Sequence, residues 1–358
     1  GTTLKEWREE VISTLHIGQG EKAGYIRKDL TEDVLARWGQ LLYGHFVDAL
    51  SDLHRLWISP HSFLTQLPFN AIPFPDGVKR EVAVIPSSDF LLRPRRTGSR
   101  PKPRFTLGVV AADAVSNSPL DLQNEEVRHL RGIVRSARHR WELAGNKPGE
   151  EPTLANLQEM VGLTRCLVFS CHGDGPHEDW GTLALGTKDI PEDVTGRQLV
   201  DSLLLEGHLR GMEVDLVVTS ACLTGQLDLE RPEEWLGLPL ALQSVWKTKA
   251  MILTLWEVEE LPAMIWVVEL VQSLTQGLTA GDALRQAQDK VRTVTREQVE
   301  VSWLAEAQDR LPPERWERVD VYWRETSRTG DQHPFADPVH WAPFVLVGDP
   351  NVTISPRR

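Results

Sequence analysis

The sequence predicts an α/β fold with a mainly parallel sheet flanked by helices and with a helical N-terminal region. Two features of the sequence support this prediction. Short apolar runs alternate with segments of helical periodicity along most of the chain, which is typical of a sheet whose strands are linked by helices. Most of these runs are apolar throughout, as expected for parallel strands that are buried on both faces.

The N-terminal region has helical periodicity up to about residue 56, followed by an apolar run and a proline-punctuated stretch. Residues 82–85 then predict a strand that ends at Pro86. Residues 93–104, RPRRTGSRPKPR, combine six basic residues with prolines, glycine and serine, which indicates an exposed linker. We therefore divide the chain into an N-terminal region, residues 1–95, and a main domain, residues 96–358.

The main domain contains the remaining apolar runs and several helical segments. The expected strands are residues 105–112, 166–171, 214–220 and 250–256. The expected helices are residues 124–137, 153–162, part of 193–207, 239–249, 261–277 and 279–294. Thr279 stands at the start of the last of these helices, where its side chain can cap the first turn.

Composition and charge narrow the class of protein. The chain has 358 residues, of which 41% are hydrophobic and 25% are charged, values typical of a soluble globular protein. The formal net charge of −12 argues against a protein that binds nucleic acid through a basic face, and we expect no nucleic-acid partner. The most apolar helical segment, residues 261–274, is too short to span a membrane and contains Glu269, so we expect no membrane insertion.

The three cysteines, Cys166, Cys171 and Cys222, are too few for a disulfide framework in a chain of this length. So small a number is typical of a reducing compartment, and the N-terminal residues lack the pattern of a signal peptide. We therefore expect a cytoplasmic protein.

Two strand ends carry the residues that are most suggestive of chemistry. The run CLVFSCHGDG ends in His172 and Gly173, and the run VDLVVTSACLTG ends in Cys222. Functional groups of open parallel sheets gather at the carboxyl edge, where each strand passes into a loop. If the two strands are neighbours, the imidazole and the thiol project from the same edge, an arrangement that suits a cysteine nucleophile with a histidine base.

Backbone amides beside the two residues complete this hypothesis. The N–H groups of Gly173 and Cys222 could together bind an oxyanion in a transition state. The separation of 50 residues between His172 and Cys222 matches a caspase-type arrangement. The simpler interpretation also stays open, because a cysteine at a strand end is usually a small apolar core residue and a His-Gly pair is usually a turn. Cys171 and His172 lack the further ligands of a zinc site, so we expect no metal and no cofactor.

Several motifs in order along residues 50–350 resemble the CHAT domains, caspase-like cysteine peptidases of the clan that also contains caspases, gingipains and separases. The matching segments are LWISPHSFLTQLPFNAI, LDLQNEEVRHL, FSCHGDG, LVVTSACLTG, MILTLWEVEE and HWAPFVLVGDP. The resemblance implies a caspase-like fold, with residues 96–358 as the peptidase domain. It also leaves open that residues 1–95 are a degenerate second caspase-like half.

The resemblance implies a cysteine endopeptidase that cleaves a protein partner, with His172 as base, Cys222 as nucleophile and Gly173 as an oxyanion-hole amide. It further implies control by a regulatory partner chain or sensor module, and a role in bacterial defence. The alternative function is a catalytically silent scaffold or signalling module that keeps the fold. The caspase sequence Gln-Ala-Cys is absent, so cleavage after Asp is not expected, and no role is assigned to Cys171.

A preference for a basic residue before the cleaved bond follows from the same resemblance. Separases share the pattern of LWEVEE and receive arginine at an acidic residue in this region. A carboxylate pairs well with a guanidinium through two parallel hydrogen bonds, so Glu257 or Glu260 could line the P1 pocket, with Asp174 as a further candidate. The alternative is that these acids are a solvated helix start, which the helix dipole favours.

Overall fold

The structure is a computed structural model of the chain, and our description covers eleven segments of it. These segments are residues 3–15, 30–87, 105–113, 119–137, 143–144, 152–174, 181–186, 191–206, 213–226, 237–327 and 332–354. Residues 93–104, the basic stretch expected to be a linker, lie outside them.

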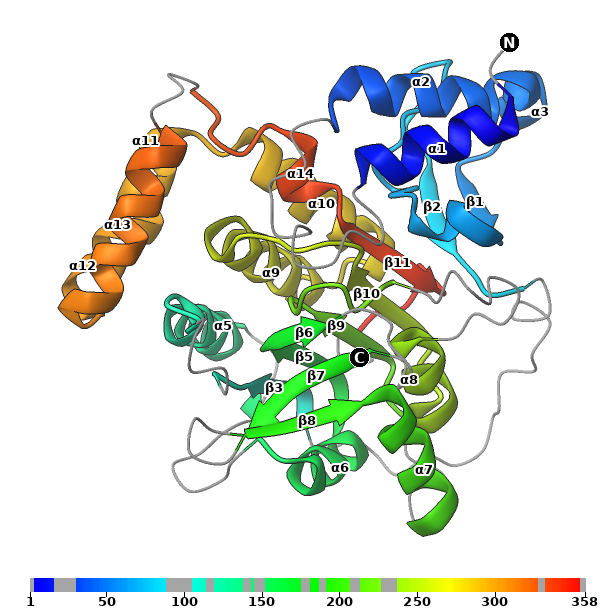
Figure 1. Cartoon of the computed structure of the whole chain (residues 1–358). Coiled ribbons are helices and arrows are strands. Elements are labelled where there is room, and N and C mark those ends of the chain that lie inside the picture. The colour runs from blue at the N-terminus through cyan, green and yellow to red at the C-terminus, as the bar shows by residue number, and fades with distance from the viewer. Residues whose placement is uncertain are drawn as a thin grey trace.

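An eight-stranded sheet forms the centre of the molecule (Figure 1). Its strand order is β1-β2-β11-β10-β9-β5-β3-β4, and every neighbouring pair is parallel except β10 with β11. The bounds are β1 Arg55–Ile58, β2 Glu81–Val84, β3 Phe105–Ala111, β4 Leu143–Ala144, β5 Thr164–Ser170, β9 Leu216–Thr219, β10 Ala250–Thr254 and β11 Phe344–Gly348. The prediction of a mainly parallel α/β sheet is confirmed.

Helices cover both faces of this sheet (Figure 1). On one face α9 packs against both α5 and α10, and α6 and α8 lie on the other face, with α7 against α8. Their bounds are α5 Gln123–Ser136, α6 Leu154–Leu163, α7 Gly196–Glu206, α8 Leu238–Trp246, α9 Glu260–Thr275 and α10 Ala280–Thr293. A helical arm projects beyond them and is built from α11 Arg296–Val299, the π-helical turn Glu300–Leu304, α12 Ala305–Arg310 and α13 Pro313–Ser327.

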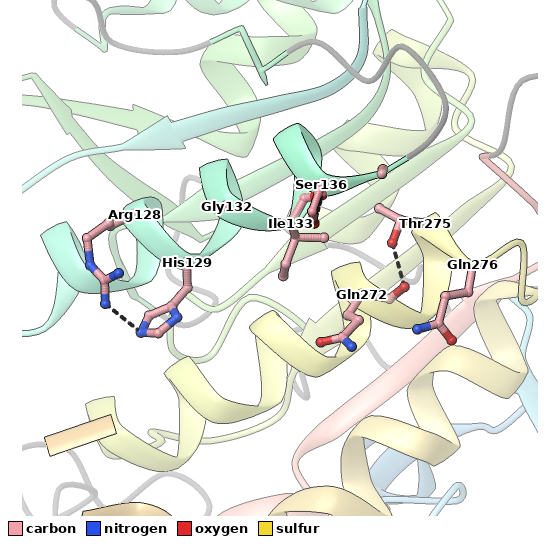
Figure 2. A pocket seen from close by; sticks show the side chains of 9 residues that line it. Arg128, His129, Gly132, Ile133, Ser136, Gln272, Thr275 and Gln276 are labelled. Atoms are coloured by element: carbon pink, nitrogen blue, oxygen red, sulfur yellow. Dashed lines mark hydrogen bonds between the residues drawn. The ribbon is translucent and has the colours of Figure 1, made fainter. Parts of the chain in front are cut away.

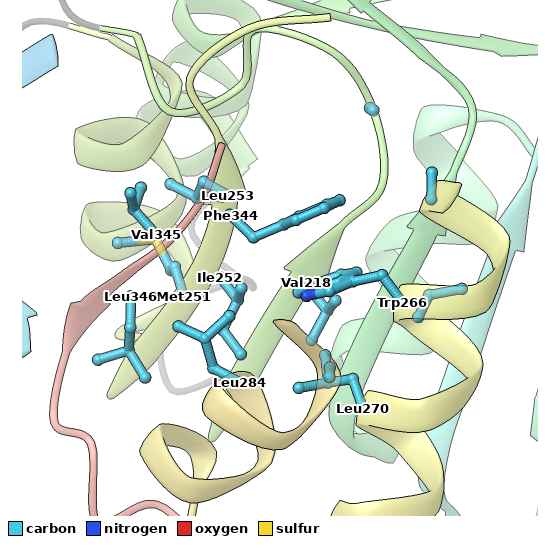
Figure 3. Close-up of a cluster of buried hydrophobic side chains, with 14 of the residues drawn as sticks. Val218, Met251, Ile252, Leu253, Trp266, Leu270, Leu284, Phe344, Val345 and Leu346 are labelled. Atoms are coloured by element: carbon cyan, nitrogen blue, oxygen red, sulfur yellow. The ribbon is translucent and has the colours of Figure 1, made fainter. Parts of the chain in front are cut away.

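Central strands of the sheet are buried along their whole length. Every residue of β9, β10 and β11 is buried, which explains why their sequences are apolar without alternation. Helix α9 is buried almost all round, and its Trp266 ring stacks on Phe344 of β11 at a centroid distance of 3.7 Å (Figure 3). This stack holds β11, which pairs antiparallel with β10 and parallel with β2, against the helical layer.

The described residues of the N-terminal region before the first strand are mostly helical, as expected. It contains α1 Leu4–Thr14, α2 Glu32–Tyr43, a 3-10 turn Gly44–Phe46 and α3 Val47–Leu50, and a second 3-10 turn, Ser62–Gln66, follows β1. Two of these helices have threonine caps, with Thr3 before α1 and Thr31 before α2. Strands β1 and β2 of this region join the main sheet through β11, so the sheet runs across the division placed near residue 95. That boundary itself stays a prediction.

Two parts of the fold differ from the expectations. β6 His172–Asp174 pairs with β7 Thr182–Gly186, which pairs with β8 Pro191–Thr195, and this separate antiparallel sheet was not predicted. β6 and β8 are mostly polar, and β7 has only five residues, so their sequences carry no clear periodic signal. The C-terminal α14 Pro338–Trp341 and strand β11 were not assigned either.

The described residues include no helix that is both long enough and apolar enough to cross a membrane.

Asn70 joins the N-terminal strands to the rest of the sheet. Its amide Nδ2 donates to the carbonyl of Val82 in β2 at 2.6 Å, and its Oδ1 accepts the N–H of Leu346 in β11 at 3.3 Å. Only one residue pair, Val84 with Val347, is in strand register between β2 and β11. The side chain of Asn70 therefore replaces backbone bonds that this short contact lacks.

Replacing Asn70 by Ala should lower the free energy of unfolding by about 1–3 kcal/mol, because two strand groups lose their partner. Denaturant unfolding followed by circular dichroism measures this change. The matched control is Gln272→Ala, which removes an exposed amide from α9 and should change stability by less than about 0.5 kcal/mol. Equal effects of the two substitutions would contradict the bridging role of Asn70.

Candidate functional site

Parallel pairing of β5 with β9 brings the two predicted site residues to one edge of the sheet. Phe169 and Thr219 are partners in the register of these strands. The N–H and the hydroxyl of Ser220 both donate to the carbonyl of Phe169, at 2.9 and 3.0 Å, so the pairing extends beyond the last strand residue. His172 lies three residues after Phe169, and Cys222 lies three residues after Thr219. The condition on which the sequence hypothesis depended, that the two strands are neighbours, is met.

The backbone after His172 lies directly against the backbone of Cys222. A Cβ atom added to Gly173 would lie 2.5 Å from the carbonyl oxygen of Cys222 and 3.1 Å from Cβ of Ala221. No side chain fits in this space without movement of β6 or of the loop. His172 and Cys222 are both half-buried, so each lies at the surface while being held by buried neighbours. Position 173 therefore requires glycine because the backbone of Cys222 lies so close to it. This requirement holds independently of any role of the Gly173 N–H group.

The loop that carries Cys222 turns sharply. Leu223, the next residue, has φ of 60°, a left-handed conformation that costs a residue with a Cβ atom about 1–2 kcal/mol. The side chain of Leu223 packs against the hydrophobic core, which helps to offset this cost. A residue strained in this way persists only where the surrounding contacts determine its conformation.

Buried threonine hydroxyls supply those contacts. The hydroxyls of Thr224 and Thr254 both donate to the carbonyl of Ala221, the residue before Cys222. Thr224 also forms a hydroxyl pair with Thr219 at 2.6 Å, and the N–H of Gly225 donates to the carbonyl of Thr254 at 2.8 Å. The loop is therefore fixed to the ends of β9 and β10, and both threonines are fully buried. None of these hydroxyls was singled out from the sequence, because their contact requires β9 and β10 to be adjacent.

The other two cysteines belong to the protein interior. Cys166 and Cys171 are buried, and burial raises the pKa of both thiols well above its ordinary value. A negative charge on Cys222 or Glu126 would raise the pKa of Cys171 further. A buried thiol with a raised pKa is a poor nucleophile. Cys222 differs from the other two cysteines because it is only half-buried.

The three acidic residues considered for a P1 pocket have different surroundings. Glu257 and Asp174 are exposed, and Asp174 ends β6 two residues after His172. Glu260 begins α9, and its two carboxylate oxygens accept the backbone N–H groups of Asp121 and Leu122 at 3.0 and 2.9 Å. Burial raises the pKa of Glu260 to about 7, against the lowering effect of these hydrogen bonds. Glu260 thus caps the start of α5, which has no side-chain cap of its own.

Another buried acid, Glu126, was not predicted as a site residue. It lies in the first turn of α5, and burial raises its pKa to about 7. A hydrogen bond with Ser170 acts in the opposite direction, and the nearby carboxylate of Glu260 adds to the rise. The sequence places paired acids in this helix, but acids in a first helical turn are usually solvated, so the pattern carries no sign of burial.

A cavity of about 580 Å³ lies away from this edge, between α5 and α9 (Figure 2). It is lined by Arg128, His129, Gly132, Ile133, Ser136, Ala137, Gln272, Thr275 and Gln276. The guanidinium of Arg128 and the imidazole of His129 lie 3.0 Å apart there. None of the predicted site residues lines this cavity.

No group of three or more His, Cys, Asp and Glu side chains in the described part of the chain is arranged to hold a metal ion.

Comparison with protein families gives a match over most of the chain. The CHAT domain matches residues 33–349. The chain belongs to the CHAT domain family. This membership relates the chain to caspase-like cysteine peptidases and confirms the resemblance found in the sequence. Comparison with curated proteins gives no match.

Comparison with solved structures gives matches to cysteine peptidases. The Arg-specific cysteine proteinase gingipain R has 13% identity and a TM-score of 0.47, with 92% of this CHAT domain chain and 69% of that chain covered. The complex of the pro- and mature domains of the same proteinase from Porphyromonas gingivalis has 13% identity and a TM-score of 0.46, with 97% and 76% covered. Separase of Saccharomyces cerevisiae, in complex with securin, has 13% identity and a TM-score of 0.42, with 65% of this chain but 14% of that chain covered.

Gly173→Ala should slow the alkylation of Cys222 by iodoacetamide about tenfold or more. The added methyl group would collide with the carbonyl of Cys222, and the resulting shift would displace β6, which carries His172, relative to the loop that carries Cys222. Gly132→Ala on α5 is the matched control, because a Cβ atom there meets nothing within 4 Å. If Gly173→Ala reacts at the unchanged rate, the close approach of the two backbones has no bearing on the reactivity of the thiol.

Proposed function

We propose that this CHAT domain is a cysteine endopeptidase that cleaves a protein substrate by acyl transfer. The observation that supports the proposal is the register of β5 and β9, which carries His172 and Cys222 to equivalent positions beyond one sheet edge. The close approach of Gly173 to the carbonyl of Cys222 is further support, because it packs β6 against the loop that carries Cys222. Imidazole and thiol are the residue types that a nucleophilic mechanism needs at such an edge.

In the proposed reaction His172 accepts the proton of the Cys222 thiol. The thiolate attacks the carbonyl carbon of the peptide bond, and the N–H groups of Gly173 and Cys222 donate to the oxyanion that forms. His172 then gives the proton to the leaving amine, and the Cys222 thioester remains. Water, deprotonated by the same imidazole, attacks the thioester and releases the second product and the free thiol.

We also propose that activity depends on a regulatory protein or sensor module that binds the domain. The loop of Cys222 supports this idea, because its backbone is strained at Leu223 and fixed by buried hydroxyls at one end. A segment of this kind has few alternative conformations, so contact with a second protein could select one of them.

Covalent labelling tests the peptidase proposal. A peptidyl electrophile that mimics a substrate should label the chain at one site, and Cys222→Ala should abolish the label. His172→Ala should slow labelling about 100-fold or more, which is the size of contribution that a general base makes. Cys171→Ala is the matched control and should label at the rate of the unchanged chain, because its thiol is buried. Labelling that survives Cys222→Ala, or that never occurs with candidate partners present, would favour a catalytically silent scaffold.

We further propose that the substrate has a basic residue before the cleaved bond. The oxygens of Glu260 already accept two backbone N–H groups, so we favour the exposed Glu257 and Asp174 as the acids that pair with it. A guanidinium or ammonium group paired with a carboxylate gains a charge-assisted hydrogen bond.

A fluorogenic panel with Arg, Lys, Asp or Leu at P1 should therefore show the highest kcat/KM for Arg and Lys. Glu257→Gln or Asp174→Asn should lower kcat/KM for Arg roughly 10- to 100-fold, which corresponds to about 1.5–3 kcal/mol for a hydrogen bond to a charged group. Glu317→Gln, which removes an exposed acid from α13, should leave the preference unchanged. A panel that favours Asp or Leu would contradict the basic preference while leaving the peptidase proposal intact.

A further inference from the structure

Ser170 is the last residue of β5 and stands two positions before His172, and it is almost completely buried. Its carbonyl accepts two N–H donors, the side-chain amide of Gln123 at 2.6 Å and the backbone N–H of Ala112 at 3.0 Å. Its hydroxyl hydrogen-bonds the carboxyl group of Glu126. Helix α5 thus holds both polar groups at this strand end through two side chains of its first turn, Gln123 and Glu126.

Glu126, which bonds Ser170, has an unusual environment for a carboxyl group. It is 5% exposed, and its Oε1 has no hydrogen-bond partner among the described residues. A buried carboxylate with an unpartnered oxygen is destabilising, and an apolar side chain would avoid this penalty. Its neighbour Glu125 is equally buried but differs, because its carboxylate pairs with Arg128 and Arg310 on the side of the helical arm.

We propose that Glu126 is a positioning residue of the candidate site, which in its ionised form holds Ser170 and, through it, the strand end that carries His172. A carboxylate accepts the Ser170 hydroxyl in a charge-assisted hydrogen bond, which is about twice as strong as a neutral one. The strand end is therefore held more firmly when Glu126 is ionised than when it is protonated.

The ionisable groups that bear on Glu126 come from two elements. Glu260 at the start of α9 raises the pKa of Glu126, and the thiol of Cys171 lies near it at the end of β5. Glu260 in turn is affected by Asp121 and Asp113. Both glutamates have a pKa of about 7, so the transition in this range belongs to the pair.

Because Glu126 ionises near neutrality, its effect should depend on pH. Glu126→Gln keeps the size of the side chain and cannot ionise. The test compares the rate of Cys222 labelling in the unchanged chain with the rate in Glu126→Gln. The first rate divided by the second should be close to one at pH 5.5 to 6 and should rise to roughly three- to tenfold by pH 8. The rise is expected because a charge-assisted hydrogen bond replaces a neutral one as Glu126 ionises. Dividing the two rates removes any dependence on pH that the two chains have in common.

Two further variants keep the test decisive. Ser170→Ala removes the hydroxyl, should show the same dependence on pH, and should not add to the effect of Glu126→Gln in the double variant. Glu125→Gln is the matched control, and its ratio should not change with pH. A ratio for Glu126→Gln that is independent of pH, or single effects that multiply in the double variant, would overturn the inference. If Glu126→Gln does not fold, as judged by thermal unfolding, Ser170→Ala decides alone.

The labelling test rests on the proposed function, so a second readout separates the two. The NMR signal of the His172 imidazole should shift on Glu126→Gln above pH 7 and should be unchanged below pH 6. If the unchanged chain is not labelled, the peptidase proposal fails and this signal still tests the positioning of His172. An imidazole signal that is the same in both chains over the whole pH range would overturn the role of Glu126 by itself.

Discussion

The lateral pairing of β5 with β9 is the constraint on which the rest of the site depends. Both strands are buried along most of their length, so a slip of the register by one residue would move every apolar side chain to the other face. Because Phe169 pairs with Thr219, the chain positions three residues beyond each strand are fixed relative to one another. Hydrophobic burial in the sheet therefore sets the placement of His172 and Cys222, although neither residue contributes much burial of its own.

Hydrogen bonds hold the backbone in place beyond the strand ends, because hydrophobic packing alone does not determine the conformation of an irregular loop. The carbonyl of Ala221 accepts two threonine hydroxyls. The carbonyl of Ser170 accepts the side-chain amide of Gln123, and its hydroxyl donates to the carboxylate of Glu126. Each buried hydrogen bond contributes only about 0.5–1.5 kcal/mol, but an unsatisfied partner costs more than that. The two networks thus restrict the loops on either side of the site by penalising their alternative conformations.

Much of the fold could be predicted from the sequence, and the reason is visible in β9 and β10. Buried parallel strands need apolar residues at every position, and such runs are easily recognised. His172 and Cys222 stood out because each follows a run of this kind. The pairing of β6 with β7 could not be predicted, because both strands are too short for a periodic pattern and β6 is polar. The hydroxyls of Thr224 and Thr254 are 30 residues apart and were missed for the same reason.

Glu126 and Glu260 show which residues escape sequence reasoning most completely. An acid at the start of a helix is expected to be solvated, because the helix dipole favours it there. In this fold Glu126 is buried beside Ser170 at the end of β5, and Glu260 is buried against the start of α5. Desolvation therefore outweighs the dipole, and the pKa of each acid rises to about 7. The folded state then favours the protonated acids, so this contribution to stability is fully present below about pH 4.5 and is lost as the pH rises through 7. Glutamine would keep the size of either side chain without this loss. Retaining two such carboxyl groups beside the candidate site is unfavourable for stability at neutral pH, which is the pattern expected when burial serves the site rather than the core.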